Sequence, residues 1–424
     1  MSNSSVRWMV APVLATTLMF YGTAGAAEKQ KTKPYPHYWL SIATTNQSMP
    51  GMSAEMSGMA AMFGGKGAFG PKRELHLQLE SPQVTAEKPT AADEIPPGQK
   101  MGDALPLVTP KVEKSTSEPD ERRSPEKYEK PKARMLIYWG CGETIGKGQP
   151  RVIDTSKMGM VEFGKAFAGR APTQQTPPSP RKGWTYGEWP SQEERADIPA
   201  DSSLVGAHRV KGNYTVDIPF SLDARRDFMA PIEFTSVTST TSGATKVTWK
   251  EVPTSIGYFA TAMGHKQETG ETIFWSASEV PETGFALQNY LTPSDVSRFI
   301  KEKVVMPPSR TTCTVPPVFK DAGGAMLQFI AYGEELNLVH PPKPKNPKQP
   351  WNIEWSVKAR LKSTGMTTLM PMEDGSDDKP ARKSKKRSQP RDEEAAKEGA
   401  DEGGEDSKAP KGGIGDRLKG IFGF

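Results

Sequence analysis

The residues whose type and spacing point most directly to chemistry are five closely spaced methionines: Met49, Met52, Met56, Met59 and Met62. Thioether sulfurs are soft ligands, and three of them can hold Cu(I). No histidine lies within the run, and its glycines oppose a stable helix. Methionine also fills gaps and forms adaptable contact surfaces. We therefore expect a loosely packed flap or contact surface; copper handling and no specific role are the alternatives.

Two cysteines, Cys141 and Cys313, are the only thiols of the chain. In an oxidising compartment an even number of cysteines favours a disulfide. The two residues lie far apart in the sequence, so a bond between them requires the two halves of the chain to pack together. We predict a Cys141–Cys313 disulfide, and two separately buried thiols are the alternative.

A glycine-rich segment follows one apolar stretch, which is the setting in which phosphate-binding loops occur. Gly140, Gly142 and Gly146 are spaced one residue too widely for the dinucleotide fingerprint, and Lys147 is followed by Gly148 where a P-loop has Ser or Thr. No helical pattern follows, so no helix N-terminus would meet a phosphate. We expect a tight turn and no cofactor.

Catalytic motifs are absent from the sequence, which has neither a G-x-S-x-G elbow nor an H-E-x-x-H zinc helix. The histidines occur singly, at His37, His76, His208, His265 and His340. No catalytic residue and no histidine metal ligand is therefore predicted. An enzyme whose groups converge from distant loops remains an alternative.

Three aromatic residues, Trp184, Tyr186 and Trp189, lie in a proline-rich and otherwise polar segment. They either fold back onto a core as anchors or form an exposed platform for a sugar, a peptide or a protein partner. The sequence favours the anchors.

The last thirteen residues, 412–424, carry an apolar stripe at helical spacing: Ile414, Leu418, Ile421 and Phe422. They follow a charged segment that cannot form a core. A short apolar segment at the end of a solvated, charged stretch predicts docking to a protein partner or a membrane surface. A frayed end with a few apolar residues is the alternative.

The first residues predict export. Arg7 precedes an apolar run that ends at Tyr21, and Ala24-Gly25-Ala26 is a small-x-small cleavage pattern. Residues 1–26 are therefore predicted to be a signal peptide, and the mature chain to be periplasmic or bound to the cell envelope without a transmembrane helix. The small net charge of +5 argues against nucleic acid as a partner.

Short runs of alternating apolar residues recur along the chain and predict strands. Leu75, Leu77 and Leu79, for example, would share one face of a strand. One helix is signalled by Thr292 as N-cap and Pro293 as its first residue. The fold class predicted is all-β: two sandwich-like blocks with long disordered linkers, one short inserted helix and a disordered charged tail.

The predicted blocks have definite bounds. The first covers residues 33–220 and contains two linkers rich in proline and polar residues, 81–131 and 171–203. The second covers residues 228–372. A basic and then acidic tail, 373–411, is expected to be disordered.

One stretch resembles a known class of module. In "TKVTWKEVPTSIGYFATAMG" a tryptophan and a tyrosine, Trp249 and Tyr258, flank a proline-containing turn, as in fibronectin type III and immunoglobulin-like sandwiches. The resemblance covers residues 228–340. It implies a β-sandwich and a scaffold or binding unit.

The function expected from the sequence is non-enzymatic binding or scaffolding in the bacterial cell envelope, with an unknown ligand. Periplasmic copper handling through the Met49–Met62 run is one alternative. A carbohydrate- or peptide-processing envelope enzyme is the other.

Overall fold

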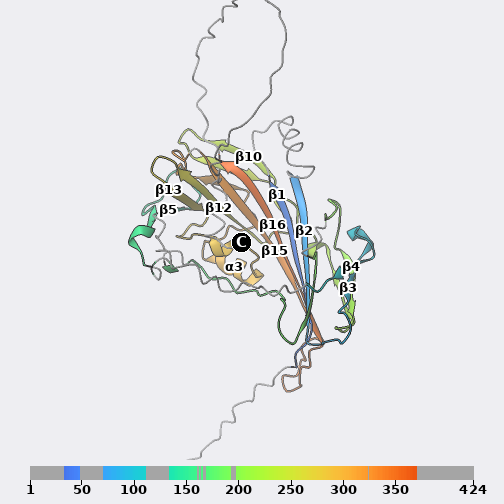
Figure 1. Ribbon diagram of the computed structural model, residues 1–424. Helices are drawn as coiled ribbons and strands as arrows, with labels where there is room; N and C mark the ends of the chain where they lie inside the picture. The colour runs from blue at the N-terminus through green and yellow to red at the C-terminus, as the bar shows by residue number, and fades with distance from the viewer. Residues whose placement is uncertain are drawn as a thin grey trace, which may run out of the picture. The chain divides into compact units, whose positions relative to one another are not determined.

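The computed structural model describes most of the chain between residues 33 and 369, and its fold is all-β (Figure 1). The described residues are 33–47, 70–110, 133–159, 162, 164–165, 169–191, 197–322 and 324–369. The predicted signal peptide, methionine run, charged tail and C-terminal segment lie outside these ranges. The predicted all-β fold class with one short helix is confirmed.

One nine-stranded sheet organises the structure, in the order β6-β5-β13-β12-β15-β16-β1-β2-β7. Its strands are β1 (His37–Gln47), β2 (Gly70–Ser81), β5 (Arg134–Trp139), β6 (Arg151–Asp154), β7 (Thr185–Trp189), β12 (Gly257–Lys266), β13 (Glu271–Ser276), β15 (Ala325–His340) and β16 (Trp355–Leu369). Neighbouring strands run antiparallel except β1 with β16 and β5 with β13. The first described strand, blue in Figure 1, therefore lies beside the last, in red.

Two smaller sheets complete the strand inventory. A four-stranded sheet has the order β4-β3-β8-β9, and a three-stranded sheet has the order β10-β11-β14. Their strands are β3 (Ala91–Glu94), β4 (Ala104–Leu107), β8 (Gly206–Gly212), β9 (Ile218–Leu222), β10 (Phe234–Ser239), β11 (Thr245–Trp249) and β14 (Thr312–Val315). Apolar residues of all three sheets form one core cluster. Both small sheets therefore pack on the same face of the large sheet, which we call its core face.

The opposite face of the large sheet is covered in part by α3 (Pro293–Lys301), the one α-helix whose bounds the structure describes in full (Figure 1). The helix begins as its sequence predicts, because Thr292 Oγ1 accepts a hydrogen bond from the Asp295 backbone N–H at 3.1 Å. Val296 and Phe299 pack on Phe259 and Ile330 of the sheet in a second apolar cluster. Short 3₁₀ turns occur at Pro97–Gln99, Thr155–Lys157, Ala224–Arg226 and Phe285–Leu287.

The two ranges predicted to be linkers contain regular structure, which corrects that expectation. β3 and β4 lie within 81–131, and β7 lies within 171–203. All three strands are short, β3 has the weak strand formers Ala, Asp and Glu, β4 contains a proline and β7 contains a glycine, so composition did not indicate them. Both predicted blocks, 33–220 and 228–372, contribute strands to the same large sheet.

The predicted disulfide between Cys141 and Cys313 is present, with a Cα–Cα distance of 5.2 Å. Cys141 follows β5 of the large sheet and Cys313 lies on β14 of the three-stranded sheet, so the bond joins two layers. Trp249 and Tyr258 pack edge to face in the core, with ring centroids 5.7 Å apart.

Candidate functional site

The candidate site lies on the face of the large sheet opposite the core, where β16 presents three cations. Residues of β16 alternate strictly, and Lys358, Arg360 and Lys362 share this second face. None of the three is fully exposed. We call these residues the cation row.

Two aromatic rings enclose the cation row. The Arg360 guanidinium carbon lies 4.3 Å from the ring centroid of Tyr290 and 5.4 Å from that of Trp39. Tyr290 comes from the loop before α3, and Trp39 comes from the neighbouring strand β1. The Lys362 ammonium also lies over the Tyr290 ring, at 4.5 Å from its centroid. Cations stacked on aromatic faces are held in place electrostatically.

Glu335 lies at the centre of this arrangement. It is paired in register with Arg360 across β15 and β16. Its Oε2 accepts a hydrogen bond from Lys358 Nζ at 2.9 Å. Its side chain is only 4% exposed, and its Oε1 is buried without any hydrogen-bond partner in the described chain.

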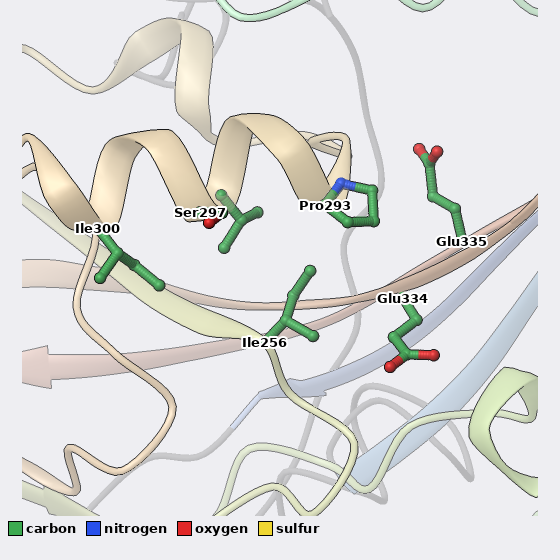
Figure 2. Close-up of a pocket in the computed structure, with 7 residues that line it drawn as sticks. Ile256, Pro293, Ser297, Ile300, Glu334 and Glu335 are labelled. Atoms are coloured by element: carbon green, nitrogen blue, oxygen red, sulfur yellow. The ribbon is translucent and has the colours of Figure 1, made fainter.

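A groove with a volume of about 410 Å³ opens beside Glu335 (Figure 2). Its walls come from α3, from the residue that precedes β12, and from an irregularity in β15: Ile256, Pro293, Val296, Ser297, Ile300, Glu334 and Glu335. The groove therefore combines an apolar wall with two adjacent carboxylates.

The two carboxylates of the groove point in different directions (Figure 2). Glu334 forms ion pairs with Arg225 and Arg226, so its charge is compensated. The register of β15 against β16 shifts between Tyr332 and Glu335, and this irregularity allows the consecutive side chains their separate surroundings.

An extended segment, residues 170–181, crosses near the site and is tied at both ends. At one end Asp295 of α3 accepts a hydrogen bond from the Thr173 N–H at 2.8 Å. At the other end Gln78 donates to the Pro178 carbonyl at 3.0 Å, and Arg181 pairs with Glu80. Burial alone would raise the pKa of Asp295, but hydrogen bonds from Thr173, Thr292 and Arg298 outweigh it and lower the pKa.

The three aromatic residues predicted as a cluster do not lie together, because successive residues of β7 point to opposite faces of the sheet. Trp189 is buried in the core cluster, while Tyr186 is buried on the other face and donates to Glu188 at 2.7 Å. Both act as anchors, which is the interpretation the sequence favours. Trp184 is only half-buried, and the Arg181 guanidinium stacks on its ring 3.4 Å from the centroid.

One histidine, His208, belongs to a buried polar network. Its Nε2 lies 2.9 Å from the Leu204 carbonyl oxygen, which can only accept, so Nε2 donates this hydrogen bond. Its Nδ1 lies 3.3 Å from Asp93 Oδ2, and the same oxygen accepts a hydrogen bond from the Tyr38 hydroxyl. Because all three side chains are enclosed, the network holds the four-stranded sheet against the large sheet.

Within the described ranges, no three His, Cys, Asp or Glu side chains gather in a group able to hold a metal ion. Met49, Met52, Met56, Met59 and Met62 lie outside these ranges, as do Ile414, Leu418, Ile421 and Phe422. No described helix has the length and apolar character needed to cross a membrane.

Sequence reasoning missed the cation row and Glu335. The alternating cations of "WSVKARLKS" are visible in the sequence, but a charged face of a strand is usually solvated. The rings of Trp39 and Tyr290 come from distant segments, and no local pattern places them over Arg360.

Comparisons with known proteins give no match: no protein-family model fits this chain, and no curated protein is similar to it. The geometry of the groove and the cation row is therefore the basis for the functional assignment.

Proposed function

We propose that this protein is an exported, non-enzymatic binding protein of the bacterial cell envelope, and that its ligand occupies the groove beside α3. The observation that carries this proposal is the unpartnered Oε1 of Glu335. A buried acceptor without a donor costs about 1–3 kcal/mol. A hydroxyl or N–H group of a ligand in the groove would supply the missing donor.

The composition of the groove supports binding rather than catalysis. Ile256, Val296 and Ile300 offer an apolar wall, as in most small-molecule sites. Hydrolysis of a glycosidic bond would need two carboxylates that flank the same bond. Here the second carboxylate, Glu334, points elsewhere and is bound by two arginines (Figure 2).

The binding proposal is tested with a matched pair of variants, Glu335→Gln and Glu334→Gln. Both remove one negative charge at adjacent positions. A thermal-shift screen of saccharides, amino acids and hydroxy acids against the mature chain would find compounds for titration. We expect a compound whose affinity falls about tenfold in Glu335→Gln and little in Glu334→Gln. A screen without binders, or binders insensitive to Glu335, would contradict the proposal.

Export is tested by fractionation of cells that produce the full chain or a chain lacking residues 2–26. We expect the full chain in the periplasmic or envelope fraction with its N-terminus at residue 27. Retention of the uncleaved full chain in the cytoplasm would refute the location proposed.

A further inference from the structure

The cation row carries a second inference, which concerns the chemical class of the ligand and rests on the proposed function. Lys358 is already neutralised, because its Nζ donates to Glu335. Arg360 and Lys362 form no ion pair within the described chain. Their hydrogen bonds go to neutral oxygens, from Arg360 Nε to Ser41 Oγ at 2.9 Å and from Lys362 Nζ to Asn289 Oδ1 at 3.2 Å.

Arg360 is oriented with one edge of its guanidinium free. The Ser41 hydroxyl accepts from the Nε–H, and the guanidinium contacts the rings of Tyr290 and Trp39. The two Nη groups donate to no side chain or carbonyl of the described residues. Parallel Nη–H groups form the fork that binds two oxygens of a carboxylate or a phosphate at once.

The charges near Arg360 and Lys362 are unbalanced. Glu335 attracts Arg360 electrostatically but already accepts a hydrogen bond from Lys358. Glu74 attracts Lys362 electrostatically without forming an ion pair with it. Burial is the main cause that lowers the pKa of Lys362 and of Arg360, so each cation has lost more hydration than its neighbours replace. An anion at this place would restore the lost interaction.

We propose that the free edge of Arg360, assisted by Lys362, binds an anionic group of the ligand, either a carboxylate or a phosphate. Glu335 stands opposite Arg360 in the register of β15 and β16. Directly opposed strand residues have Cβ atoms about 4.5–5.5 Å apart, so one small ligand unit reaches both. The ligand class is therefore a polar compound that carries a hydroxyl or N–H donor beside an anionic group.

Three probes test this class on the mature chain: glucuronate, inorganic phosphate and uncharged glucose, titrated by calorimetry. We expect at least one of the two anions to bind, with affinity that falls with salt and is about tenfold above that of glucose. Binding of glucuronate alone identifies a carboxylate source, and binding of phosphate alone identifies a phosphate source.

Variants locate the anion. Arg360→Gln is expected to weaken the bound anion about tenfold or more, and Arg360→Lys, which keeps the charge without the fork, to weaken it less. Lys246→Gln, on an exposed position of β11, is the matched control and should bind as the parent does. Thermal melts confirm that each variant is folded. If Arg360→Gln does not fold, Arg360→Lys is used in its place.

Three results would overturn the inference. The first is equal binding of glucose and glucuronate. The second is anion binding that survives Arg360→Gln and Arg360→Lys unchanged. The third is absence of binding by both anions. If a neutral compound binds and its binding depends on Glu335, the proposed binding function stands and only the anionic ligand class is wrong. Failure of this inference is therefore distinguishable from failure of the proposed function.

Discussion

The two faces of β16 differ more than those of an ordinary half-buried strand. On the core face, Val357, Ala359 and Leu361 are almost fully buried among hydrocarbon side chains. On the other face, alternate residues are cations stacked on rings and partly withdrawn from water. The strand period of two allows one segment to serve both purposes. The packing that stabilises the fold therefore lies on the core face. The incompletely compensated charges lie on the other face, and such charges are common at binding sites.

The largest effect is expected on the core side, from loss of the disulfide. The bond closes a loop of 172 residues between the large sheet and the three-stranded sheet. Replacement of both Cys141 and Cys313 by Ala should lower the free energy of unfolding by about 4 kcal/mol, measured by urea denaturation. Thiol titration of the denatured, unreduced mature protein should find no thiols. Two titratable thiols would show that the bond does not form.

A pair of adjacent substitutions compares the two faces directly. Leu361→Ala removes packed hydrocarbon from the core and should cost about 3 kcal/mol of unfolding free energy. Lys362→Ala removes a desolvated cation that lacks an ion pair, and should change stability by less than about 1 kcal/mol. Denaturant curves of the two variants give both numbers. Equal losses would mean that the cation row is a structural element.

The core face was largely predictable from the sequence. Leu75, Leu77 and Leu79 were expected on one face and are all buried, because a period of two is a local property. The helix at Pro293 was equally local, since its cap and its first-turn residues are adjacent. The parallel pairing of β1 with β16 was not predictable, because it joins residues more than 300 positions apart.

The pH dependence of stability tests the attachment of segment 170–181 to α3. The lowered pKa of Asp295 means that its stabilising effect is present above the unfolded value of about 3.9 and is lost as the pH falls through the folded value. Asp295→Asn should cost about 1–2 kcal/mol at neutral pH and remove that part of the acid dependence. Identical acid denaturation of variant and parent would contradict this role.

The candidate site could be predicted only in part. The sequence indicated Trp184 and Tyr186 as a cluster of interest, and they lie at one end of the same sheet face as the cation row. It did not indicate Glu335, because a missing hydrogen-bond partner is visible only in three dimensions. The loop that brings Tyr290 over Arg360 precedes α3, and the two residues lie seventy positions apart in the sequence.

The smallest effect concerns Trp184, where an anchor and an exposed platform predict different energetics. Its ring is half-buried, stacked on Arg181 and near His37, with ring centroids 6.2 Å apart. A cation–π contact at such an exposed site contributes about 0.5–1 kcal/mol. We therefore expect Trp184→Ala and Arg181→Ala to be coupled by about that amount in a double-mutant cycle measured by urea denaturation. Coupling near zero would mean that the ring stabilises nothing locally and is free to contact a ligand. Coupling of the expected size makes Trp184 an anchor like Tyr186, and confines the ligand to the groove and the cation row.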